Sequence, residues 1–277
     1  MELARTLADL HSACTALRQR ASTLALVPTM GALHDGHRAL VRAAVASNAA
    51  VVTSIFVNPL QFGATEDLAR YPRDEAGDLA ILREAGCDLV WMPDVATMYP
   101  ADAVTTIDVA GPAQQWEGTA RPGHFRGVAT VCAKLFGQVR TDTAYFGEKD
   151  WQQLQVVTRM VADLHLPLAI VGVPTVREPD GLALSSRNRF LTQQDRVRAP
   201  QLHAELVGLA AALTGGSAAE PLLDASRARL SDGGFDVDYL ALVDGPSLRG
   251  ISVRQPGARL IVAAHLGSVR LIDNIAA

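Results

Sequence analysis

The sequence has few cysteines, no long apolar run and no excess of basic residues, and each absence excludes a class of protein. Cys14, Cys87 and Cys132 are its three cysteines, and their wide spacing matches neither a disulfide framework nor a metal motif. We interpret them as buried packing residues. No stretch reaches the roughly 18 apolar residues of a membrane span, and residues 1–20 lack the apolar core of a secretion signal. We therefore expect a soluble, cytoplasmic protein.

The charge balance argues against polyanionic partners. The formal net charge is −4 over 277 residues, whereas nucleic-acid binders usually carry a basic patch or a basic balance. We expect no nucleic-acid partner and no membrane partner. Small anionic substrates remain possible, because a pocket for them needs only a few basic residues.

Apolar runs alternate with helical patterns along the first two thirds of the chain. This alternation predicts βαβ units, a parallel sheet and a doubly wound α/β domain that is Rossmann-like. The expected strands are residues 24–28, 50–57, 88–92, 104–109, 143–146 and 168–176. The expected helices are residues 33–48, 74–85, 127–139 and 151–164.

The rhythm changes after about residue 176. The turn signal Glu-Pro-Asp-Gly at residues 178–181 is followed by helical patterns at 192–213 and 218–230, and then by short strands near 239–243, 259–263 and 269–272. We predict two domains, a doubly wound domain at residues 1–176 and a smaller α+β domain at residues 177–277.

Two histidines follow the first predicted strand. Residues 27–37 read Val-Pro-Thr-Met-Gly-Ala-Leu-His-Asp-Gly-His and join that strand to the first helix. Ligands of open α/β sheets bind at the carboxyl ends of strands, and a helix N-terminus there offers free N–H groups to phosphate. His34 and His37 project from one face and can donate hydrogen bonds to a triphosphate. The spacing alone also fits ordinary surface histidines or part of a metal site.

The longer run is more specific than the histidine pair. His-Asp-Gly-His is similar to the His-x-Gly-His signature of nucleotidyltransferases, and Pro-Thr-Met-Gly-Ala-Leu-His-Asp-Gly-His resembles the pantothenate synthetase family. That family condenses pantoate with β-alanine, using ATP. The resemblance runs through five ordered segments from about residue 24 to 191. It implies a homodimer and ATP contacts from Met30, Gly31, His34 and His37.

The next two segments concern the acid substrate and a metal ion. An amide such as Gln61 suits a substrate with hydroxyls and a carboxylate, although a turn amide facing water fits equally well. The resemblance implies that Gln61 contacts pantoate. An acidic stretch at residues 67–78 surrounds Tyr-Pro-Arg, and alignment on that tripeptide puts Asp78 at the Mg²⁺ position. A solvated acidic helix face is the alternative.

Gly-Glu-Lys-Asp at residues 147–150 ends a strand and begins a helix. Lys149 can reach phosphate oxygens, and Asp150 can cap the helix or bind a ribose hydroxyl. A plain capped helix start would explain the same residues. The resemblance implies ATP contacts from Gly147, Glu148, Lys149 and Asp150, and a pantoate contact from Gln153.

Residues 176–188 lie at the predicted domain boundary. Two hydroxyls and an arginine at a helix start make a second phosphate-binding edge, with a simple helix cap as the alternative. The segment is similar to the Lys-Met-Ser-Lys-Ser element of the superfamily in a Ser-Ser-Arg form. The resemblance implies a backbone contact of Val176 with adenine and ATP contacts from Leu184, Ser185, Ser186 and Arg187. The cationic residues Arg121, His124 and Arg126 are assigned no role.

The resemblance implies a two-step reaction through a pantoyl adenylate. The groups that neutralise the triphosphate, together with Mg²⁺, would be His34, His37, Lys149 and Arg187. Residues 58–73 and the C-terminal domain would close over the adenylate. Two alternatives remain: a nucleotidyltransferase that moves AMP onto a phosphate, and a non-catalytic nucleotide sensor.

Overall fold

The computed structural model describes residues 1–47, 49–63, 68, 71–214 and 216–277. Its strands are β1 (Glu2–Ala4), β2 (Leu24–Thr29), β3 (Ala50–Ile55), β4 (Leu89–Trp91), β5 (Thr143–Gly147), β6 (Ala169–Val173), β7 (Phe235–Asp244), β8 (Ala258–Leu266) and β9 (Val269–Ala276). Its α-helices are α1 (Leu7–Arg20), α2 (Asp35–Ala46), α3 (Glu75–Ala85), α4 (Val95–Met98), α5 (Glu117–Ala120), α6 (His124–Val139), α7 (Trp151–Asp163), α8 (Gln193–Arg198), α9 (Gln201–Ala212) and α10 (Ala219–Asp232). Short 3₁₀ turns are η1 (Pro59–Gln61), η3 (Gly111–Ala113), η4 (Glu148–Asp150) and η5 (Ser186–Phe190).

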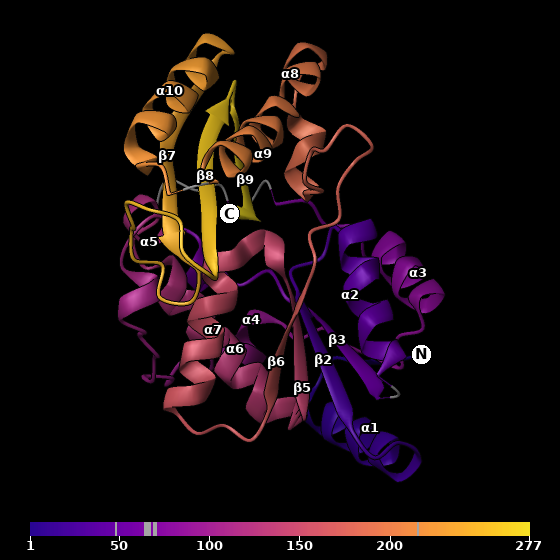
Figure 1. The fold of residues 1–277 in the computed structure, drawn as a ribbon. Helices are drawn as coiled ribbons and strands as arrows, with labels where there is room; N and C mark the ends of the chain where they lie inside the picture. The colour runs from indigo at the N-terminus through magenta and orange to yellow at the C-terminus, as the bar shows by residue number, and fades with distance from the viewer. Residues whose placement is uncertain (48, 64–67, 69–70, 215) are drawn as a thin grey trace.

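The described part of the first 173 residues folds around a six-stranded sheet in the order β1-β4-β3-β2-β5-β6. Each neighbouring pair is parallel. Alternate residues of β2 enter different core clusters, with Leu24 and Leu26 on one face and Ala25 and Val27 on the other. Helices α1, α6 and α7 cover the first face, and α2 and α3 cover the second (Figure 1). The doubly wound prediction is therefore confirmed.

The C-terminal part is a smaller α+β unit, as predicted. Strands β7, β8 and β9 form an antiparallel sheet, and α9 and α10 pack against it with their own apolar cluster (Figure 1). The boundary at residue 176 stays a prediction. No helix in the described ranges combines the length and the apolar character that crossing a membrane requires.

Two local predictions were wrong, and one short strand was missed. The strand expected at residues 104–109 does not form; instead the N–H of Ile107 donates to Thr130 Oγ1 on α6, so this segment pairs with a helix. The helix expected at 192–213 is two helices, because Pro200 lies between α8 and α9 and has no N–H to donate. Strand β1 was not predicted, since three residues are too short for a clear period. The predicted closing loop, residues 58–73, falls partly outside the described residues.

All three cysteines are buried and free of disulfides, as predicted.

Candidate active site

Most of the predicted site residues line one cavity of about 220 Å³ beyond the carboxyl ends of β2, β5 and β6. Parallel strands bring their carboxyl ends to one edge of a sheet, so segments far apart in sequence meet there. The predicted residues that line it are Met30, His34, His37, Gln61, Gly147, Lys149, Asp150, Gln153, Val176, Leu184, Ser185, Ser186 and Arg187. Their roles in binding stay predictions, but their convergence is a structural fact.

The two histidines form the N-terminal cap of α2. The N–H of Gly36 donates to His34 Nδ1 at 3.1 Å, and the N–H of His34 donates to His37 Nδ1 at 3.2 Å. The ring centroids are 4.2 Å apart. Since each Nδ1 accepts a hydrogen bond, the neutral rings carry their proton on Nε2. The cap therefore fixes which ring nitrogen can donate to a ligand.

The environment keeps both rings neutral. Burial, with the positive charge of Lys149 beside it, lowers the pKa of His34 to about 4. Burial, with His34 as its neighbour, lowers the pKa of His37 to about 3. A neutral imidazole that donates through Nε2 can bind a phosphate oxygen without titrating near neutral pH.

Gly36 is needed for this arrangement. A Cβ on Gly36 would lie 2.9 Å from His34 Cε1 and 3.0 Å from its Nδ1. Any side chain at this position would therefore displace the His34 ring.

Gln61 is held in place by Asn58. Asn58 Nδ2 donates to Gln61 Oε1 at 3.1 Å, and Asn58 Oδ1 accepts from the hydroxyl of Tyr99 at 2.8 Å. Gln61 Nε2 approaches Met30 Sδ at 2.8 Å. Asn58 is 1% exposed, and its amide is hydrogen-bonded to Gln61, Gly127 and Tyr99. Gln61 thus presents its amide to the cavity in one orientation.

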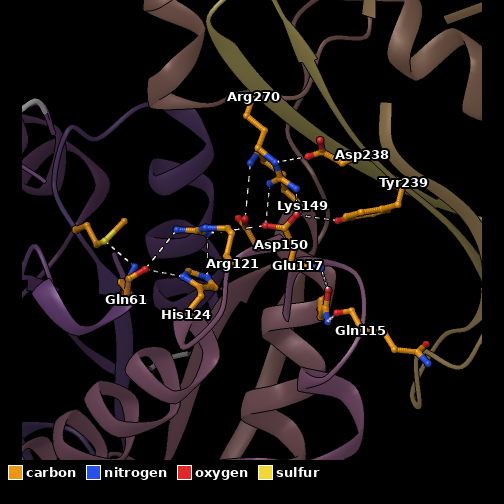
Figure 2. A network of polar contacts seen from close by, with 12 residues as sticks. Gln61, Gln115, Glu117, Arg121, His124, Lys149, Asp150, Asp238, Tyr239 and Arg270 are labelled. Atoms are coloured by element: carbon orange, nitrogen blue, oxygen red, sulfur yellow. Dashed lines mark hydrogen bonds and ion pairs between the residues drawn. The ribbon is translucent and has the colours of Figure 1, made fainter. Parts of the chain in front are cut away.

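Arg121 and His124, the latter at the start of α6, support the same segment. His124 Nδ1 lies 2.8 Å from the carbonyl oxygen of Gln61, and Arg121 donates to that oxygen at 3.4 Å. Figure 2 shows these side chains gathered around Gln61. Both residues line the cavity, although no role was expected for them from the sequence. Their position next to Gln61 depends on the packing of α6 against η1, which no local pattern reveals.

Lys149 lies in the turn between β5 and α7. Its side chain is 19% exposed, and its ammonium lies 3.8 Å from Asp150 Oδ1. Lys149, Asp150, Gln153, Ser185 and Arg187 also line a second, larger cavity of about 1170 Å³, so the two cavities adjoin. The larger one lies against the C-terminal sheet. The site therefore opens toward the C-terminal unit.

The predicted Ser-Ser-Arg edge forms the 3₁₀ turn η5. Ser185 caps it by accepting from the N–H of Arg187 at 3.3 Å. Tyr71, which belongs to the Tyr-Pro-Arg tripeptide, lines both cavities beside this turn. The carbonyl of Val176 accepts from the N–H of Leu184 at 3.0 Å, which closes a hairpin across residues 176–184.

Three predicted site residues line neither of the two cavities: Gly31, Glu148 and Asp78. Gly31 has a φ of 83°, and a Cβ there would lie 2.9 Å from Asp78 Oδ2. The side chain of Glu148 pairs with Arg259 at 3.0 Å. Gly31 and Asp78 thus belong to the turn before His34, and Glu148 belongs to the turn before α7.

Asp78, the predicted metal ligand, is occupied by backbone contacts, and its role toward a metal ion stays a prediction. It is 3% exposed, and its carboxylate oxygens accept the N–H groups of Ala32 at 3.0 Å and Leu33 at 2.7 Å. Burial raises the pKa of Asp78, and these two hydrogen bonds oppose the rise. Asp78 therefore anchors the turn before His34. Within the described ranges, no group of three or more His, Cys, Asp or Glu side chains is arranged to hold a metal ion.

A buried polar network ties the C-terminal sheet to the site (Figure 2). Arg270 of β9 forms a bidentate pair with Glu117 at 2.6 and 3.0 Å, and the hydroxyl of Tyr239 donates to Glu117 at 2.9 Å. Glu117 also lies 3.8 Å from Arg121. No sequence pattern predicted this network, because Glu117 is separated from Tyr239 and Arg270 by more than a hundred residues.

Comparison with known proteins agrees with this geometry. A family model described as Pantoate-beta-alanine ligase matches residues 2–276. The chain is 59% identical over 277 residues to the pantothenate synthetase of Granulibacter bethesdensis, covering 99% of this chain and 96% of the relative. It is 56% identical to that of Acidiphilium cryptum, covering 100% of both chains.

Solved structures are similar across the whole chain. Pantothenate synthetase from Thermus thermophilus has a TM-score of 0.93 at 50% identity, covering 100% of this chain and 99% of the other. Pantoate-beta-alanine ligase from Francisella tularensis, complexed with beta-gamma ATP and beta-alanine, has a TM-score of 0.82 at 32% identity, covering 100% and 97%. The chain, with its capped histidine pair, Lys149 and Arg187 around one cavity, therefore belongs to the pantoate–β-alanine ligase family.

Proposed function

We propose that this enzyme condenses pantoate with β-alanine at the expense of ATP, through a pantoyl adenylate. The observation that carries the proposal is the convergence of His34, His37, Lys149 and Arg187, from distant segments, on a single cavity that Gln61 and Gln153 also line. The cations and the N–H donors suit a triphosphate, and the two amides suit an acid that bears hydroxyls.

In the first step the carboxylate oxygen of pantoate forms a bond to the α-phosphorus of ATP, and the bond from that phosphorus to pyrophosphate breaks. Catalysis of such a transfer is mainly positioning and charge neutralisation. Nε2–H of His34 and of His37 would donate to phosphate oxygens, and Lys149 and Arg187 would neutralise the charge that builds on pyrophosphate.

In the second step the amine of β-alanine forms a bond to the activated carbonyl carbon. AMP leaves with the electron pair of the acyl–oxygen bond, and the amine loses a proton. The adenylate is prone to hydrolysis, so exclusion of water matters at this stage. The adjoining larger cavity gives the amine a route to the acyl carbon.

Three further parts of the proposal concern the setting of the reaction. Mg²⁺ would bind with the phosphates of ATP, since that ion commonly keeps few protein ligands. Pairing into a homodimer and a cytoplasmic location rest on the family resemblance and on the sequence composition.

An omission assay tests the function. ATP, pantoate and β-alanine should together release AMP and pyrophosphate and give one amide, whereas ATP with pantoate alone should release pyrophosphate once per site. A dinucleotide product would support plain nucleotidyl transfer, and ATP binding without pyrophosphate release would support a sensor. His37→Ala and Lys149→Ala should each slow adenylate formation by at least tenfold in a single turnover, with the fold intact by circular dichroism.

A further inference from the structure

The C-terminal strand β9 contacts the turn that carries Lys149. Asn274 Nδ2 donates to two successive carbonyl oxygens of that turn, Glu148 O at 2.9 Å and Lys149 O at 2.9 Å. Asn274 is 4% exposed. A buried amide that donates to two successive carbonyls restricts their position, because the turn can shift only by giving up these hydrogen bonds.

The orientation of the Asn274 amide is set by Arg259. Arg259 Nε donates to Asn274 Oδ1 at 2.5 Å, so the amide oxygen faces β8 and the NH₂ group faces the turn. The guanidinium also pairs with Glu148 Oε2 at 3.0 Å and lies 3.5 Å from the centroid of the Trp151 ring. Figure 1 shows β8 reaching the first turn of α7. Arg259 therefore joins both sides of the contact.

Asp273 fixes β9 from the other side. Its carboxylate accepts the N–H of Asn274 at 2.7 Å and forms a bidentate pair with Arg177 at 2.7 and 2.8 Å. Asp273 thus holds this part of β9 in place, and Asn274 contacts the turn that carries Lys149.

We propose that Asn274 is a positioning residue for Lys149. By holding the carbonyls of residues 148 and 149, it aims the Lys149 ammonium at the phosphates, so the C-terminal sheet completes the nucleotide site. This inference rests on the proposed function, in which Lys149 acts on the triphosphate. A misplacement of about 1 Å at a reacting group costs up to a hundredfold in rate, which is the scale of effect that losing two hydrogen bonds would bring.

The two half-reactions separate positioning from general support. Lys149 neutralises pyrophosphate, which departs in the first step and is absent from the second. In Asn274→Ala, pyrophosphate release from ATP and pantoate in a single turnover should slow by about tenfold or more. Amide formation from supplied pantoyl adenylate and β-alanine should stay within about twofold of the unsubstituted enzyme. Equal losses in both half-reactions, or no loss in the first, would overturn the proposal.

Ser226→Ala is the matched control. It removes a buried hydrogen bond within the C-terminal unit, from Ser226 Oγ to Glu205 Oε2 at 2.6 Å, and Ser226 lines neither cavity. Both half-reactions should stay within about twofold. A selective first-step loss equal to that of N274A would show that any loosening of the C-terminal unit has this effect, and would refute a specific role for Asn274.

A double-mutant cycle tests whether Asn274 acts through Lys149. K149A and K149A/N274A should have the same first-step rate, whereas a further tenfold fall in the double variant would refute the mechanism. If N274A does not fold, N274D gives the same comparisons, since it keeps the acceptor for Arg259 and loses both donors. If the unsubstituted enzyme releases no pyrophosphate, the proposed function itself is refuted. If the unsubstituted enzyme is active and N274A is unaffected, only the role of Asn274 is refuted.

Discussion

Gly127→Ala should disturb the site around Gln61 by displacing the backbone that positions Gln61. Gly127 lies in the first turn of α6, where the helix packs directly on η1. A Cβ there would lie 2.2 Å from Leu60 O and 2.6 Å from the N of Gln61. Both neighbours are backbone atoms, so no side-chain rotation relieves the contact. Because ordinary contact begins at 3.4 Å, α6 and η1 must separate by about 1 Å, a displacement on the scale that costs up to a hundredfold in rate.

Two quantities should change together in G127A. Overpacking of this kind costs about 1–3 kcal/mol of unfolding free energy, equivalent to roughly 2–4 °C in Tm for each kcal/mol. Gln61 moves with η1, and the hydrogen bond from Asn58 Nδ2 to the carbonyl of Gly127, now 3.1 Å, should weaken. We therefore expect kcat/KM for pantoate to fall by roughly ten- to a hundredfold, measured as pyrophosphate release, with Tm measured by calorimetry.

Gly137→Ala is the control on the same helix. Gly137 is exposed, and a Cβ there would meet nothing within 4 Å. Alanine at such a position should raise stability by about 0.5–1 kcal/mol, with kcat/KM unchanged. The reasoning fails if G127A keeps the kcat/KM of the unsubstituted enzyme, or if its Tm rises as that of G137A should.

Four further predictions test the site's electrostatics. Because burial lowers the pKa of His34 to about 4 and that of His37 to about 3, the first-step rate should show no inflection near pH 6.5; such an inflection, abolished by H34Q, would contradict neutral rings. The same depressed values mean that the unfolded chain binds more protons below pH 6.5, so Tm should fall as pH drops from about 6.5 to about 4, and less steeply in H34Q/H37Q. Asp78→Asn should lose about 1–3 kcal/mol in urea unfolding, because the amide nitrogen that replaces one carboxylate oxygen cannot accept the backbone N–H which that oxygen accepts; a change confined to the Mg²⁺ dependence would support the metal assignment instead. Glu117→Gln should destabilise by about 1–3 kcal/mol in the same assay, because half-buried Arg270 loses its bidentate partner and keeps Asp238 as its counter-charge; an unchanged midpoint would refute that role.

Much of the sheet could be read from the sequence. Leu24–Thr29 and Ala50–Ile55 are mostly apolar because they are buried on both faces, and such runs identify central parallel strands without any contact information. The helix at residues 151–163 was predicted well because its buried face repeats with the helical period. Residues 104–109 were wrongly predicted to form a strand, because a β-branched run predicts a strand whether or not a sheet edge is free to pair with it.

The motif residues divide according to how local their task is. His34 and His37 cap their own helix, so their spacing along the chain already fixes how the two rings lie in the site. Asp78 and Glu148 sit in motifs of the same strength, yet each turns away from both cavities to anchor a partner 45 or more residues away. The direction of such side chains depends on what packs beside the turn, which a motif does not contain.

What the sequence determined by itself is therefore the alternation of elements, the carboxyl edge at which the site lies, and the residues that act within their own turn. Only the tertiary structure decided that Gln61 is held by α6, that Glu117 gathers Arg270 and Tyr239, and that Asn274 reaches the Lys149 turn. The physical reason is that periodicity and capping act over a few residues of chain, whereas each of these contacts joins segments far apart in sequence that meet only when the chain packs.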